Sequence, residues 1–174
     1  MVIINLSLKL NASSFSARKA KGLIYLDMKD YRQSASYFKE QSTKQPKENV
    51  WLYYYSESLY KQDLLDSAMS VALIMQNTVD REKYWRNYES CLLLQAEIVY
   101  KKNHFSKALE LLDQIRFDFK DNAEFCYYYG LSNLNVVENP NKRKAKKYIE
   151  RAIDKGYDVD KELIDKLQIK IRQK

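Results

Sequence analysis

A repeating pattern of small and large residues constrains the fold of this chain more than any other feature. In residues 21–46, small Gly22 is followed by Tyr25, then by a polar turn, and then by Ser34 and Phe38. The small position of Ser34 recurs, at spacings of 34, 40 and 37 residues, at Ala68, Ala108 and Ala145. Small residues let two antiparallel helices approach closely, and large residues fill the space between them. The pattern therefore predicts stacked helical hairpins.

Composition agrees with a helical fold. The 174 residues include only 3 glycines and 2 prolines, so turns are few and long runs of helix-forming residues remain uninterrupted. The two irregular spacings predict two local changes. Six extra residues near "DREKYWRNY" lengthen the first helix of the third hairpin, with Asp80 as its N-cap. Three extra residues in "VVENPNK" lengthen the turn of the fourth hairpin.

In order and spacing, these positions resemble the tetratricopeptide repeat, a helix-turn-helix unit of about 34 residues. The resemblance covers residues 15 to about 172 and implies an all-α fold, a right-handed superhelix (solenoid) of about four repeats with a C-terminal capping helix. The implied repeats occupy approximately residues 15–48, 49–80, 81–121 and 122–157, and the capping helix residues 158–174. Residues 1–14 are expected to be a hydrophobic lead-in or the remnant of an export signal.

The tyrosine-rich stretches "WLYYYSESLY" and "EFCYYYGLSNL" raise the question of function, because three successive helical residues cannot all face one core. In the family that the chain resembles, the first helices of successive repeats line a concave groove. Resemblance and helical geometry place Tyr55 and Tyr129 in the core, and Tyr54 against the neighbouring repeat. They predict a groove that consists of Tyr53, Glu57, Tyr60, Leu93, Glu97, Tyr100, Tyr127, Leu131 and Leu134.

Such a surface suits an extended or helical peptide with aliphatic or aromatic anchors and a Lys or Arg. We therefore expect a non-enzymatic scaffold or adaptor that binds a protein or peptide partner. Two alternatives stay open at this stage. In one alternative, some of these tyrosines are buried packing residues. In the other, an elongated third helix or the N-terminal segment of the chain fills the groove.

A different class of function is suggested by charge. The formal net charge is +7, but residues 1–138 carry 18 basic against 17 acidic side chains, whereas residues 139–174 carry 12 against 6. The alternative function is therefore the binding of RNA or another polyanion through Lys142, Arg143, Lys144, Lys146 and Lys147. The same run is also consistent with a solvated helix face, because Ala145 and Ile149 keep the repeat register through it.

Signs of catalysis are missing from the sequence. The single histidine, His104, falls in a predicted turn, and no phosphate-binding, zinc-protease or nucleophile-elbow motif occurs. The two cysteines lack the spacing of a metal or redox site. We expect no catalytic residues, no cofactor, no metal and no membrane span. The expected protein is a cytoplasmic monomer or weak self-associate, or an exported or periplasmic one if residues 1–12 belong to a signal peptide.

Overall fold

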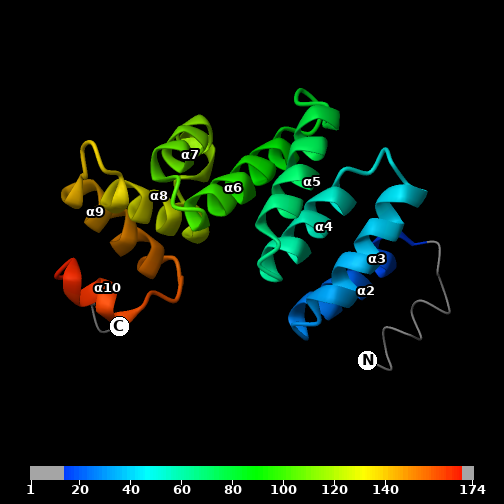
Figure 1. The fold of residues 1–174 in the computed structure, drawn as a ribbon, viewed down its shortest axis with the longest axis horizontal. Helices are drawn as coiled ribbons and strands as arrows, with labels where there is room; N and C mark the ends of the chain where they lie inside the picture. Colours follow the sequence, from blue (N-terminus) through cyan, green and yellow to red (C-terminus); the bar gives the residue numbers. More distant parts are fainter. Residues whose placement is uncertain (1–13, 170–174) are drawn as a thin grey trace. The chain divides into compact units, whose positions relative to one another are not determined.

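The computed structural model of the chain describes residues 14–169, and every regular element in that range is an α-helix (Figure 1). The helices follow one another as α2 (Phe15–Asp27), α3 (Tyr31–Lys44), α4 (Val50–Lys61), α5 (Leu65–Thr78), α6 (Trp85–Lys101), α7 (Phe105–Phe119), α8 (Ala123–Asn135), α9 (Lys142–Asp154) and α10 (Lys161–Lys166). The chain forms two compact units, and the boundary between Cys91 and Leu92 falls within α6. The predicted all-α repeat architecture is confirmed.

Close contact between paired helices depends on the small residues that define the repeat. Ser34, Ala68, Ala108 and Ala145 are all fully buried. In the first unit, Gly22 on α2 lies directly against the ring of Phe38 on α3, where a β-carbon would collide with the ring. In the second unit, a β-carbon on Gly130 of α8 would lie 2.8 Å from Ile149 of α9. These positions are small because two helices meet there.

Three turns between paired helices share one backbone feature, a residue with a positive φ angle. Lys29, Asp63 and Asn103 have positive φ angles of 59°, 65° and 63°, and they recur at the 34- and 40-residue spacings of the small residues. Each turn reverses the chain right after a helix, where a left-handed residue closes the last turn. The backbone N–H of the following residue donates back to the helix, as in His104 N–H to the Val99 carbonyl at 2.9 Å. The fourth pair differs, because the longer loop 136–141 connects α8 with α9, as the sequence predicted.

In the first unit, aromatic side chains build the core between α3 and α4. Trp51 is fully buried and its ring stacks on that of Phe38, with centroids 6.1 Å apart. Tyr54 stacks on the same Phe38 ring at 5.0 Å. The predicted contact of Tyr54 with the neighbouring repeat is therefore confirmed. Aromatic pairs of this kind contribute about 0.5–1.5 kcal/mol beyond the area that they bury.

Two predicted helix limits were wrong. The helix of the third repeat begins at Trp85 rather than after Asp80, because the Asp80 carboxylate accepts hydrogen bonds from the Glu82 and Lys83 N–H groups at 3.1 Å and holds a separate turn. Of the predicted capping-helix residues that the structure describes, 158–169, only Lys161–Lys166 are helical, and the chain leaves this helix at Gln168, which has a φ of 52°. The predictions for residues 1–13 and 170–174 lie outside the described residues.

Candidate functional site

A pocket of about 350 Å³ opens in the second unit between α8 and α10, and we call it the α8–α10 pocket. Its floor is largely apolar or aromatic, and its rim is charged. Three helices and the residue before α10 contribute its lining, which consists of Tyr100, Tyr127, Leu131, Leu134, Asn135, Asp160, Glu162, Leu163 and Lys166. Four of the nine predicted groove residues therefore lie in one place, namely Tyr100, Tyr127, Leu131 and Leu134.

Helical geometry on α8 explains why its three successive tyrosines have different environments. Tyr127 shares a stripe with Leu131 and Leu134, at intervals of four and three residues, and this stripe faces the pocket. Tyr129 lies on the opposite stripe and is fully buried, as predicted. Tyr128 lies between them, with its ring edge-on to those of Tyr127 and Tyr100 at 5.3 and 5.6 Å. Tyr127 thus lines the pocket, Tyr128 packs against two neighbouring rings, and Tyr129 belongs to the core.

Tyr100 supplies one of the polar groups that line the pocket. Its phenol oxygen accepts a hydrogen bond from the Asn135 side-chain amide at 2.8 Å, and its ring contacts Phe105 and Tyr128. Burial raises the pKa of the Tyr100 phenol above 10.0, although the Asn135 hydrogen bond acts in the opposite direction. The phenol is consequently neutral near pH 7, and its O–H can donate to a ligand carbonyl.

Tyr127 is the second tyrosine that lines the pocket. Its ring stacks on Tyr157, which precedes α10, with centroids 4.4 Å apart and an interplanar angle of 22°. Burial raises the pKa of the Tyr127 phenol, and the negative charge of Asp160 raises it further. Asp160 lines the same pocket, so its carboxylate is placed to influence groups inside the pocket.

Five other residues predicted for the groove do not line this pocket. Tyr60, Leu93 and Glu97 are 7%, 5% and 4% exposed, so the prediction that they form an open floor was wrong. Tyr53 is half-buried and packs against the core cluster of Ala72, Met75 and Cys91. Glu57 is also half-buried.

Tyr55 requires a separate correction, because it is half-buried rather than a core residue. The core positions of α4 are taken by Trp51, Ser56 and Leu59 instead. Ser56 faces α5, where its hydroxyl donates to the Ala68 carbonyl at 2.7 Å.

The basic run of α9 is divided among different faces of the helix. The ammonium of Lys144 lies 4.6 Å from the centre of the Tyr129 ring, and Lys146 donates to the Gln168 carbonyl at 2.6 Å, just after α10. Lys142, Arg143 and Lys147 are exposed. Ala145 and Ile149 are fully buried in the same helix, in the repeat register that the sequence indicated. Two of the five basic residues therefore have intramolecular roles.

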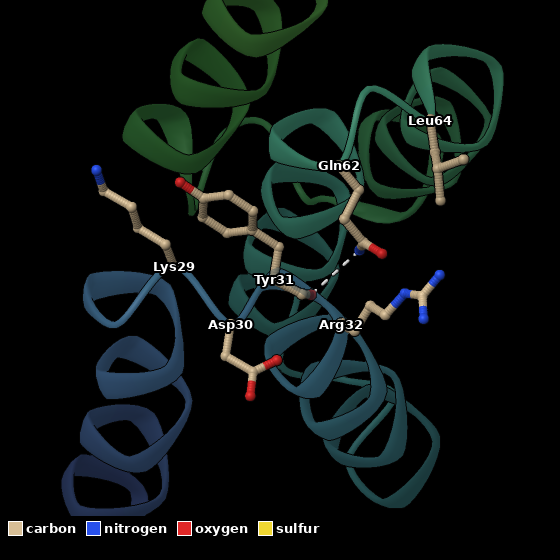
Figure 2. A pocket seen from close by; sticks show the side chains of 6 residues that line it. All are labelled: Lys29, Asp30, Tyr31, Arg32, Gln62 and Leu64. Carbon is tan, nitrogen blue, oxygen red and sulfur yellow. Dashed lines mark hydrogen bonds between the residues drawn. The ribbon is translucent and has the colours of Figure 1, made fainter.

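A second cavity, of about 360 Å³, lies at the turns of the first unit and was not predicted (Figure 2). It is lined by Lys29, Asp30, Tyr31, Arg32, Gln62 and Leu64. The Gln62 amide donates to the Tyr31 carbonyl at 3.1 Å and ties the turn of α4–α5 to the start of α3. Figure 2 shows that the side chains of Lys29 and Arg32 extend in different directions.

Residues 14–169 contain neither a metal-binding cluster nor a membrane-spanning helix. This range contains no cluster of three or more His, Cys, Asp or Glu side chains arranged to hold a metal ion. Within the same range, the structure has no helix with both the length and the apolar character needed to cross a membrane. His104 is exposed and precedes α7, and its side chain makes no capping hydrogen bond.

The sequence pattern did not predict the residues that α10 and its N-cap bring to the pocket, namely Asp160, Glu162, Leu163 and Lys166. The helical spacing of Val159, Leu163 and Leu167 indicated that this segment covers the last repeat. The spacing did not specify which face of α8 the segment approaches. That information lies in the packing of Leu163 and Leu167 on the cluster of Leu131 and Ile149.

Successive helix pairs, followed by the short helix α10, are consistent with tetratricopeptide helix-turn-helix repeats. Over 110 residues, or 62% of the chain, the sequence is 30% identical to the tetratricopeptide repeat protein 30 homolog of Drosophila pseudoobscura pseudoobscura. Over 93 residues, or 53% of the chain, it is 31% identical to the tetratricopeptide repeat protein 30 homolog of Drosophila melanogaster. The chain is thus distantly homologous to these proteins and is a tetratricopeptide-like protein.

The similarity has a limited extent. The matched regions correspond to 16% and 13% of the lengths of these two relatives. No protein-family profile matches the chain.

Proposed function

We propose that this chain is a non-enzymatic protein-binding module and that the α8–α10 pocket receives a segment of its partner. Tetratricopeptide repeats generally mediate interactions between proteins. The observation that carries the proposal is the convergence of Tyr100, Tyr127, Leu131 and Leu134 on one pocket. Three leucines lie there beside six residues with polar or charged groups. An apolar surface combined with a set of placed polar groups is typical of binding pockets.

The chemistry of the floor supports recognition of a side chain rather than catalysis. Tyrosine provides a large rigid surface with a polar tip, and residues of this type dominate the energetics of protein interfaces. Leu131, Leu134 and Leu163 add aliphatic surface around the two phenols. The volume of about 350 Å³ lies near the lower end of the range of about 300–1,000 Å³ that is usual for ligand pockets. This size suits one or two side chains of a peptide.

Selection from a library of short random peptides tests the proposal and does not require the partner to be identified first. The immobilised full chain is expected to enrich peptides that share an apolar anchor, and Tyr127→Ala should reduce the affinity of these peptides at least tenfold. Phe117→Ala is the matched control, because Phe117 is an aromatic residue of α7 that is 78% exposed and does not line the pocket. This control should bind like the wild type.

A second substitution separates loss of binding from loss of structure. Leu134→Ala leaves the Tyr127–Tyr157 stack intact and removes only part of the floor. It should weaken peptide binding with unchanged helicity. Equal affinity in the wild type and in both pocket variants would overturn the proposal.

Polyanion binding is less well supported by the arrangement of α9. The exposed Lys142, Arg143 and Lys147 remain available, but Lys144 and Lys146 contact Tyr129 and the Gln168 carbonyl. Salt distinguishes the two functions, because phosphate contacts release counterions and weaken steeply with salt. Peptide binding that depends on an apolar floor should be much less sensitive.

A further inference from the structure

The rim of the α8–α10 pocket has a charge opposite to that of the protein as a whole. Asp160 and Glu162 line the pocket, and Lys166 is the basic residue among its lining residues. From residue 157 to residue 166, the chain carries four acidic side chains against two lysines, whereas the whole chain has a formal charge of +7. The acidic character is therefore local to this segment.

The acidic rim stands directly beside the apolar floor. Leu163 follows Glu162 by one residue, and both line the pocket. Leu163 also packs on the core cluster that contains Leu131 and Ile149, which holds α10 against α8. A ligand that covers the floor must therefore place its neighbouring groups near Asp160 and Glu162.

We infer that the α8–α10 pocket binds a basic segment of a partner protein, in which an aliphatic or aromatic residue fills the floor and a neighbouring Lys or Arg meets Asp160 and Glu162. This inference rests on the proposed function and adds the chemistry of the partner. Charge complementarity supports it, since two rim carboxylates favour a cation and disfavour a phosphate or an acidic peptide. The Tyr100 hydroxyl is placed to donate a hydrogen bond to a carbonyl of the bound segment.

The rim charges can be removed without disturbing the helix. The Asp160 carboxylate caps α10 by accepting a hydrogen bond from the Glu162 N–H at 2.8 Å. Asparagine is an equally good N-cap, so Asp160→Asn keeps this hydrogen bond and removes only the charge. The test variant is Asp160→Asn/Glu162→Gln. The matched control is Asp158→Asn/Asp165→Asn, which removes two exposed charges from the same segment at positions that do not line the pocket.

The experiment uses three displayed peptide libraries against the full chain. One library combines Leu with Lys, the second combines Leu with Glu, and the third combines Ser with Lys. The inference predicts that the wild type enriches the Leu–Lys library alone. The enriched peptides should bind the test variant roughly three- to tenfold more weakly and the control variant unchanged. Added salt should narrow this difference.

Other outcomes overturn the inference in distinguishable ways. Enrichment of Leu–Glu peptides, or equal binding to the test variant, would refute the basic partner and leave the proposed function intact. Enrichment of Ser–Lys peptides would show that the chain recognises positive charge without an apolar anchor, which contradicts the inference. Absence of any enriched peptide would overturn the inference and the proposed function together. A dimer of the chain that the test variant dissociates would identify a second copy, rather than a partner protein, as the occupant.

Discussion

The ring of Tyr127 on α8 stacks on the ring of Tyr157, with centroids 4.4 Å apart and an interplanar angle of 22°. This contact joins the pocket wall to the segment that leads into α10. Because α10 has only six residues, tertiary contacts must hold it in place. Such contacts include the stack, the packing of Leu163 and Leu167, and the hydrogen bond from Lys146 to the Gln168 carbonyl.

We predict that Tyr157→Ala loosens α10. Loss of the stack removes about 0.5–1.5 kcal/mol beyond the buried area, so the amides of Lys161–Lys166 should exchange their hydrogens faster. Hydrogen exchange followed by mass spectrometry measures this effect. Tyr157→Phe keeps the ring and should protect α10 like the wild type. Unchanged exchange in Tyr157→Ala would mean that the stack does not anchor the helix.

Gly22→Ala should destabilise the first unit. Alanine is the better helix former by about 1 kcal/mol, but a β-carbon here would overlap the buried Phe38 ring. Overpacking of a core costs about 1–3 kcal/mol, so we expect a net loss of stability. Thermal unfolding of Gly22→Ala, Phe38→Leu and the double variant measures the coupling. The double variant should be more stable than the sum of the two single effects implies, and a melting point of Gly22→Ala at or above the wild type would contradict this packing.

Tyr129 should make stability depend on alkaline pH. Its hydroxyl donates to the Asp113 carboxylate at 2.7 Å, and burial together with this hydrogen bond raises the pKa of the phenol to about 12. In the unfolded chain a tyrosine ionises near pH 10. Between these values the unfolded state releases a proton that the folded state retains, so the contribution is complete below pH 10 and is lost as the pH rises towards 12.

Urea unfolding of the wild type and Tyr129→Phe over this pH range measures the effect. Near pH 7 the variant should be less stable by about 0.5–1.5 kcal/mol, the usual value of one hydrogen bond. The advantage of the wild type should shrink between about pH 10 and 12. A difference that stays constant with pH would exclude the linkage.

Neighbouring lysines of α9 should respond differently to the same substitution. Lys146→Met removes the hydrogen bond to the Gln168 carbonyl and should lower stability by about 0.5–1.5 kcal/mol. Lys147 is exposed, and Lys147→Met should change stability by no more than about 0.5 kcal/mol. Chemical denaturation of the two variants compares them at equal net charge. Equal effects would indicate that the basic run is a uniform solvated surface.

The fold could be predicted from the sequence because its determinants are local and recur. A small residue is required where paired helices touch, and these positions are the buried Ser34, Ala68, Ala108 and Ala145. Their regular spacing in the sequence predicts the helix pairs. The end of a helix is decided by finer interactions. The Asp80 carboxylate could cap either a helix or a turn, and its hydrogen bonds to Glu82 and Lys83 selected the turn.

The candidate site could be predicted only in part. Spacing on α8 placed Tyr127, Leu131 and Leu134 on one stripe, and they line the pocket. The prediction for Tyr60 failed, because its exposure depends on residues distant in sequence. The acidic rim was missed for the same reason, since Asp160 and Glu162 reach the pocket only through the packing of α10 on α8.

The measurement that tests the central claim most directly is a methyl NMR titration of the leucine-labelled full chain with a peptide selected on it. We expect the largest chemical-shift changes at Leu131, Leu134 and Leu163, which line the α8–α10 pocket. Leu73 of α5 is 44% exposed and lies outside the pocket, so it serves as an internal reference. Larger changes at Leu73 than at the three pocket leucines would contradict the account.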